Sequence, residues 1–144
     1  MAHLSLVTLG VDDLPRAIRF YESLGWHRSG ASAEDVVAFL EGGAVVLALF
    51  GRADLADDAR VEPDPSGGHG SIALAMNVES PAMVDATLKV AADAGGQITK
   101  PADRADWGGY SGYFRDPDGH LWEVTHNPHF GLAADGRVVL PGSE

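Results

Sequence analysis

Glu123 is the acidic residue best placed to do chemistry. Side chains alternate between the two faces of a strand, so in its strand-like run Glu123 shares a face with Leu121 and Thr125. Trp122 and Val124 occupy the other face and suit packing against a helix. Glu123 is thereby predicted to point into a cavity, where a poorly solvated carboxylate suits the role of a general base. A glutamate on the surface of the strand is the alternative, which alternation alone does not exclude.

Other residue types that carry chemistry are few. The chain has no cysteine, which excludes disulfides, thiolate metal sites and cysteine nucleophiles. His120 and His126 are predicted on the strand face opposite Glu123, so they cannot join it without a bulge. Ser111 does not stand in the Gly-x-Ser-x-Gly pattern of hydrolase nucleophiles. Any chemistry on this strand therefore centres on one carboxylate.

The composition narrows the class of protein. The 144 residues carry 21 acidic and 10 basic side chains, a formal charge of -11, which disfavours binding to nucleic acids or anionic membranes. A solvated surface explains this charge, and attraction of a cationic ligand is the alternative. The apolar runs fall short of the roughly 20 residues of a membrane span, and the first residues contain no basic leader. We expect a cytoplasmic protein.

Two segments of the chain have the same organisation. Residues 6–12 and 71–77 are short strand-like runs, and each leads into an amphipathic helix. Asp13 is the expected N-cap of the first helix, and Gly25 is expected to end it. Ser80 is the expected N-cap of the second helix, directly before a proline. The repetition predicts two similar modules.

Each helix is followed by three expected strands. Apolar runs at 36–40 and 44–50 flank a glycine turn, and those at 110–115 and 120–125 flank an Asp-Pro-Asp-Gly turn. Weaker strands are expected within 26–33 and 97–101. The stretch between the modules, rich in Asp, Pro and Gly, is predicted to be a solvated loop. The resulting division is a first module at 3–51, a linker at 52–69, a second module at 70–128 and a tail at 129–144.

The two leading strands combine a bulky face with a face of small or hydroxylated side chains. Leu6 and Thr8 share the second kind of face in the first strand, and Ser71 and Ala73 share it in the other. Small side chains leave room for a ligand. A closely packed second layer of structure explains the same pattern equally well.

Residues 107–113 are rich in aromatic side chains and glycine. Flat rings beside glycine suit stacking on a planar ligand, so Trp107, Tyr110 and Tyr113 are candidate ligand-binding residues. Tyr110 and Tyr113 are three positions apart and therefore point to opposite faces of a strand, so we expect at most one of them to face the cavity. An edge strand whose aromatic side chains fill a dimer contact is the alternative.

Two motifs identify a known family. The opening Val-Asp-Asp-Leu with Ala-Ile-Arg-Phe-Tyr-Glu-Ser-Leu-Gly, and the closing Phe-Arg-Asp-Pro-Asp-Gly-His-Leu-Trp-Glu-Val, resemble the vicinal oxygen chelate superfamily. This superfamily contains glyoxalase I, bleomycin resistance proteins and extradiol dioxygenases, and the resemblance spans residues 3–128. It implies an α+β fold in which two βαβββ modules form a curved eight-stranded mixed sheet with a concave ligand pocket, usually in a homodimer.

The resemblance also implies where a metal would bind. The ligand positions of the metal enzymes correspond here to Leu6, Leu47, Ser71 and Glu123. Only Glu123 is a competent ligand, whereas a catalytic divalent metal needs about three histidine or carboxylate donors. We therefore expect a protein without metal or other cofactor, whose cavity the two leucines make apolar.

These observations predict a metal-independent protein that binds a small molecule, resembling the antibiotic-sequestering members of the superfamily. One alternative is a glyoxalase-like lyase or isomerase in which Glu123 is the general base. Another is a metal-dependent enzyme with a different ligand set. The predicted ligand-binding residues are Leu6, Thr8, Leu47, Ser71, Ala73, Trp107, Tyr110, Tyr113, Leu121, Glu123 and Thr125.

Overall fold

One pattern of strands and a helix occurs twice in the chain. The computed structural model describes residues 4–30, 36–63 and 72–141. The first module consists of β1 (Leu6–Val11), α1 (Leu14–Ser23), β2 (His27–Arg28), β3 (Val37–Glu41) and β4 (Val46–Gly51). The second consists of β5 (Leu74–Asn77), α3 (Pro81–Asp93), β6 (Gln97–Arg104), β7 (Tyr110–Arg115) and β8 (Leu121–His126).

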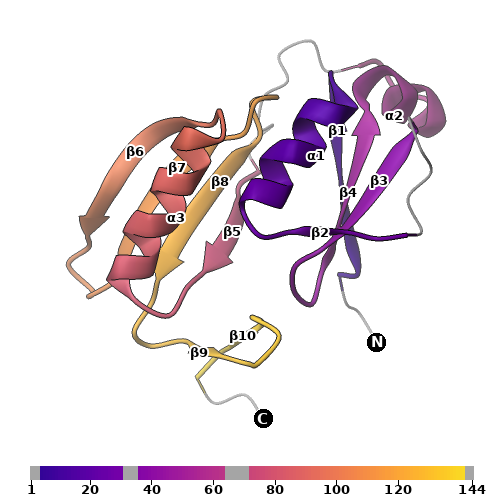
Figure 1. The fold of residues 1–144 in the computed structure, drawn as a ribbon. Helices are drawn as coiled ribbons and strands as arrows, with labels where there is room; N and C mark the ends of the chain where they lie inside the picture. Colours follow the sequence, from indigo (N-terminus) through magenta and orange to yellow (C-terminus); the bar gives the residue numbers. More distant parts are fainter. Residues whose placement is uncertain (1–3, 31–35, 64–71, 142–144) are drawn as a thin grey trace.

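Each module forms its own four-stranded mixed sheet (Figure 1). The strand orders are β1-β4-β3-β2 and β5-β8-β7-β6, with the first pair of each sheet parallel and the other pairs antiparallel. The predicted α+β class and the two βαβββ modules are confirmed. The eight strands are divided between two sheets, with β1 and β5 as edge strands, in place of the one continuous sheet that we expected.

Two short elements lie in segments where none was predicted. Helix α2 (Arg52–Ala59) follows β4 directly, so the expectation of a solvated loop is wrong for these residues. The tail forms a small hairpin of β9 (Gly131–Leu132) and β10 (Val138–Val139). Among the described residues, no helix is both long enough and apolar enough to cross a membrane.

The local signals at the helix ends are confirmed. The Asp13 side chain accepts a hydrogen bond from the backbone N–H of Arg16 at 3.0 Å, and the Ser80 hydroxyl accepts one from Met83 at 3.2 Å. Each cap satisfies a donor that the first turn of the helix leaves free. Gly25 follows α1 with a φ of 101°, a conformation that a side chain would disfavour.

The strand faces are also largely as predicted. Leu9 and Val11 on β1 and Trp122 and Val124 on β8 are buried in one hydrophobic core together with residues of α1 and α3. The run predicted at 71–77 is an exception, because β5 begins only at Leu74 and the Ile72 side chain, expected on the bulky face, is 65% exposed.

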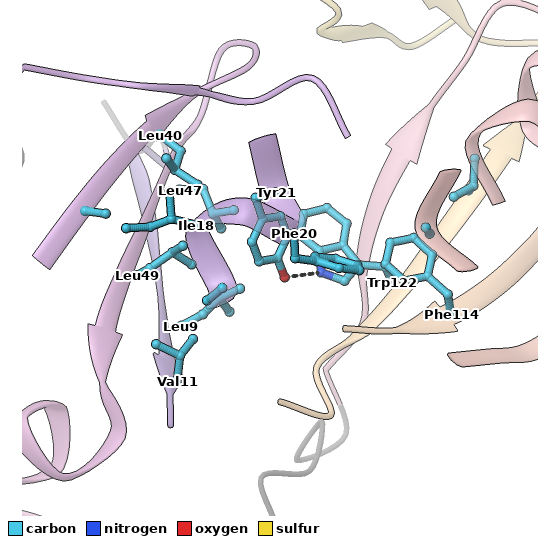
Figure 2. Close-up of a cluster of buried hydrophobic side chains, with 14 of the residues drawn as sticks. Leu9, Val11, Ile18, Phe20, Tyr21, Leu40, Leu47, Leu49, Phe114 and Trp122 are labelled. Atoms are coloured by element: carbon cyan, nitrogen blue, oxygen red, sulfur yellow. Dashed lines mark hydrogen bonds between the residues drawn. The ribbon is translucent and has the colours of Figure 1, made fainter. Parts of the chain in front are cut away.

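Helix α1 lies between the two sheets and contributes to the core of both modules. Figure 2 shows Phe20 and Tyr21 of α1 between the leucines of the first sheet and the aromatic side chains of the second. Phe20 contacts Phe114 with ring centroids 6.1 Å apart, and Tyr21 contacts Trp122 at 5.9 Å. The helix faces of both sheets therefore point towards one shared core, and their other faces point away from it.

An ionic cluster joins the modules at the Asp-Pro-Asp-Gly turn. The Asp118 side chain is fully buried, and its Oδ1 accepts hydrogen bonds from the Asp12 backbone N–H at 2.8 Å and Arg16 Nη2 at 3.1 Å. Arg52 Nη2 lies 3.6 Å from the same oxygen, and Arg52 Nε also donates to Asp12 at 2.8 Å. The turn predicted from sequence thus holds the second module against β1, α1 and α2 of the first.

A second polar cluster lies deeper in the same junction. The Tyr21 hydroxyl donates to Asp116 Oδ2 at 2.6 Å. It also accepts from Trp122 Nε1 at 3.0 Å (Figure 2). Asp116 Oδ1 accepts from the backbone N–H groups of Asp118 and His120. Burial raises the pKa of Asp116, which the hydrogen bond from Tyr21 partly opposes. The aromatic core therefore contains a fully paired polar network.

This network predicts a loss of stability at alkaline pH. Burial, with a smaller effect of the Asp116 carboxylate, raises the pKa of Tyr21 well above its ordinary 10.0. The stabilising contribution of the neutral phenol is complete below that ordinary value and is lost as the pH rises, because only the unfolded chain can ionise this group. In urea unfolding series above pH 10, the stability advantage of the wild type over Tyr21→Phe should shrink by up to about 1.4 kcal/mol per pH unit. A constant advantage would contradict the assignment.

Candidate functional site

Glu123 lies in the middle of the outer face of the second sheet, the face turned away from the helices. Strand β8 runs between β5 and β7, so Glu123 is paired with Ala75 on one side and Tyr113 on the other. Leu121 and Thr125 share this face by alternation along β8. Thr125 is buried, whereas Leu121, Tyr113 and Glu123 are half-buried. The structure thus brings four predicted site residues together. We name this surface the Glu123 face, and it is formed by Tyr113, Leu121, Glu123 and Thr125.

Tyr113 is coupled to Glu123. Burial raises the pKa of the Tyr113 phenol, and the neighbouring Glu123 carboxylate raises it further through its charge and a hydrogen bond, against the opposing charge of Lys100. The phenol therefore stays protonated at neutral pH and can donate a hydrogen bond to the carboxylate. The pair places a phenol donor on β7 beside a carboxylate acceptor on β8.

Tyr110 does not belong to the Glu123 face. It has the opposite parity on β7, and its hydroxyl donates to Asp85 of α3 at 2.7 Å, on the helix side of the sheet. The guanidinium carbon of Arg104 lies 5.6 Å from the centre of its ring. Tyr113 is therefore the tyrosine that shares the face with Glu123, in agreement with the expectation that at most one of the two tyrosines faces this side.

Leu47 also points to the other side of its sheet. In the parallel register of β1 and β4, Leu47 is paired with Val7. Leu6 is paired with Val46, and Thr8 is paired with Ala48. Paired residues share a face, so Leu47 packs in the core, where it is 2% exposed, while Leu6 and Thr8 lie on the outer face. The residue of β4 that shares the outer face with Leu6 is Val46, one position before the predicted Leu47.

The remaining predicted residues are dispersed. Trp107 is 54% exposed in the turn before β7, where its ring covers Gly109 so closely that a Cβ there would lie 2.0 Å from a ring carbon. Ala73 is exposed next to β5 and lines a groove described below. Ser71 lies outside the described residues. Neither Trp107 nor Ala73 is paired with Glu123 in the sheet.

Two cavities lie where the modules meet, and Glu123 belongs to the wall of neither. The α2 cavity, about 380 Å³, is bounded by Thr8 on β1, Arg52 and Leu55 on α2, and His120 and Leu121 at the start of β8. Two residues predicted to bind a ligand, Thr8 and Leu121, lie together in the wall of this cavity. His120 Nε2 lies 2.8 Å from the Gly10 carbonyl oxygen at this junction.

The second cavity is the larger. The inter-module groove, about 640 Å³, runs between Val7 and Leu47 of the first module and Leu74 and Met76 of the second, and it extends to Arg137 of the tail hairpin. Met76 and Arg137 are not among the site residues predicted from the sequence. The alternation of bulky side chains along β5 could have indicated that Met76 faces inward. The tail contains no motif from which the position of Arg137 could be predicted.

Comparisons with known proteins agree with this geometry. The family model of the Glyoxalase/Bleomycin resistance protein/Dioxygenase superfamily matches residues 2–124. The chain belongs to this superfamily. The similar solved structures include a glyoxalase-related enzyme from Fulvimarina pelagi, 35% identical with a TM-score of 0.88, covering 97% of this chain and 99% of that one.

Two further solved structures are less similar in sequence. A glyoxalase/bleomycin resistance protein/dioxygenase family enzyme from Burkholderia phytofirmans PsJN is 19% identical with a TM-score of 0.78, covering 87% of this chain and 98% of that one. A lactoylglutathione lyase from Agrobacterium tumefaciens is 25% identical with a TM-score of 0.67, covering 88% of this chain and 95% of that one. A comparison with curated proteins found no match.

The side chains around Glu123 do not fit the metal that the superfamily implies. The residues paired with Glu123 are an alanine and a tyrosine, and the position opposite Leu6 on β4 is a valine. Within residues 4–30, 36–63 and 72–141, no group of three histidine or carboxylate side chains could hold a metal ion. One carboxylate falls short of the three or so protein donors that a catalytic metal needs.

Proposed function

We propose that this protein is a metal-independent small-molecule-binding member of the superfamily that captures its ligand on the Glu123 face. The carrying observation is that Glu123 is an isolated carboxylate, held beside the Tyr113 phenol among apolar and hydroxyl side chains. Such a surface recognises a ligand with an apolar body and a cationic or hydrogen-bond-donating group. The formal charge of -11 favours the approach of a cation.

We further propose that a second copy of the chain closes this face. In one chain the outer face of the second sheet is exposed at Ala75, and that of the first sheet is exposed at Leu6 (40%), although α2 packs against its other end at Gly10. Binding sites enclose most of the surface of a small ligand, so an open sheet face needs a cover. A homodimer in which the outer face of one sheet meets the other would supply it.

The test is a titration of cationic, neutral and anionic small aromatic molecules by calorimetry, with wild type, Glu123→Gln and Tyr113→Phe. A cationic ligand should bind saturably, and Glu123→Gln should weaken it about 10- to 100-fold, because a charge-assisted hydrogen bond contributes about 1.5–3 kcal/mol. Tyr113→Phe keeps the carboxylate and should weaken binding less. Absence of saturable binding across the panel, or equal binding by Glu123→Gln, would count against the proposal.

A glyoxalase-like lyase or isomerase with Glu123 as general base is the second candidate. The similarity to a lactoylglutathione lyase at 25% identity favours it. The same variants separate the two candidates. Glu123→Gln would abolish turnover of an activated carbon acid while retaining substrate binding if Glu123 removes a proton, whereas a binder shows no turnover in either form.

A further inference from the structure

The inter-module groove has features of a binding site that the Glu123 face does not use. Along β8, Trp122 and Glu123 point to opposite sides of the sheet, and of these two residues only Trp122 lines the groove. Its volume of about 640 Å³ falls within the range of pockets that hold small organic molecules. The groove reaches Ala75, the neighbour of Glu123 on β5, but none of the four residues that define the Glu123 face lines it.

Its inner wall is aromatic and apolar. Trp26, just after α1, meets Trp122 of β8 edge to face, with ring centroids 6.3 Å apart. Leu24 and Met76 extend this wall, and the exposed Met83 of α3 lies at its border. Indole rings and thioethers pack well against flat apolar molecules. The groove thus suits an aromatic ring system.

One side of the groove also carries polar backbone groups. The Val78 N–H donates to the Thr125 carbonyl at 2.9 Å across the β5–β8 pair. In a parallel pair, alternate residues of an edge strand direct their N–H and C=O groups to the neighbour, so those of Ala75 and Asn77 point away from β8, towards the groove. These groups can hydrogen-bond polar substituents of a bound molecule.

The border of the groove at the tail hairpin carries one basic and one acidic side chain. Arg137 borders the groove from the tail hairpin, and its guanidinium makes no hydrogen bond or ion pair with another side chain in the described part of the protein. Asp135 also borders it, but one of its carboxylate oxygens accepts the Arg137 backbone N–H at 2.9 Å within the turn. Arg137 is therefore the side chain available to pair with an anion.

We propose that the inter-module groove binds a small aromatic molecule with one anionic group, a carboxylate or sulfonate. The ring system packs against Trp26 and Trp122, and the anion pairs with the guanidinium of Arg137. This site takes a ligand of opposite charge to the one proposed for the Glu123 face. Occupation of one site therefore leaves the charged group of the other free.

The probe is 8-anilinonaphthalene-1-sulfonate, whose fluorescence rises in an apolar site, titrated into folded protein at neutral pH. Wild type should bind one equivalent saturably, and Arg137→Gln should weaken binding about fivefold, as expected for a half-solvated ion pair. Arg60→Gln removes an exposed arginine outside the groove and should bind like the wild type. Met83→Trp, at an exposed helical position, should weaken binding by filling the border of the groove.

Three results would overturn this proposal: equal binding by Arg137→Gln and Arg60→Gln, equally tight binding of the uncharged N-phenyl-1-naphthylamine, or no saturable binding by the wild type. Near-ultraviolet circular dichroism of each variant establishes that its aromatic core is intact, so a weakened signal reports on the groove. Glu123→Gln should leave probe binding unchanged. Failure at the Glu123 face is thus distinguishable from failure at the groove.

Discussion

Replacing Asp118 with alanine should lower the free energy of unfolding by about 3 kcal/mol, the low end of the cost of breaking a buried ion pair. Asp118 is fully buried, and its carboxylate faces two guanidinium groups and one backbone N–H. Alanine would leave Arg16 and Arg52 without this counter-charge and the Asp12 N–H without its acceptor. Because the two arginine side chains are 42% and 18% exposed, water can compensate for part of the loss.

Urea unfolding followed by tryptophan fluorescence measures this effect. Asp118→Asn keeps an oxygen acceptor and should fall between wild type and Asp118→Ala. Asp103→Ala is the matched control, since Asp103 and its partner Lys100 are both mostly exposed at 3.4 Å, and such pairs contribute little. If Asp118→Ala unfolds at the same urea concentration as Asp103→Ala, the ionic cluster does not hold the modules together.

Tyr21→Phe should destabilise the protein by about 2–3 kcal/mol, although it removes a single oxygen atom. The phenol oxygen links Asp116 and Trp122, so its loss leaves a buried carboxylate oxygen and a buried indole N–H without partners. The packing of the ring itself is unchanged. The expected cost is therefore the desolvation of two polar groups rather than a cavity.

Tyr110→Phe provides the comparison for Tyr21→Phe. It removes a similar phenol–carboxylate hydrogen bond, to Asp85, which is exposed to solvent. Water can replace that partner, so the midpoint of urea unfolding should shift far less than in Tyr21→Phe. Equal shifts in the two variants would show that burial of the Tyr21 network adds nothing to stability.

The sequence predicted the elements whose signals are local. The caps Asp13 and Ser80, the turn at Gly25 and the alternation of Trp122 with Glu123 depend on neighbouring residues, and the structure has them as expected. Helix α2 lacked such a signal, because its only buried side chain is Ala56 and acidic residues follow it. Its amphipathic pattern is too weak to separate it from a loop.

The candidate site was only partly predictable for a different reason. The position of Leu47 depends on the register between β1 and β4, and the side of the sheet to which Tyr110 points depends on contact with α3. The ion pair of Arg16 with Asp118 joins residues 102 positions apart. Such relations arise from tertiary packing, which residue types and spacing along one chain do not specify.

The position of α1 between the two sheets has a consequence for how the repeated halves relate to one another. In a duplicated architecture, each half would ordinarily have an interior of its own and could melt alone. Here Phe20 and Tyr21 from the first half fill space against Phe114 and Trp122 of the second. Neither half has a complete interior without the other, so the two repeats form one cooperative folding unit, whose separate pieces would expose aromatic surface and associate to cover it.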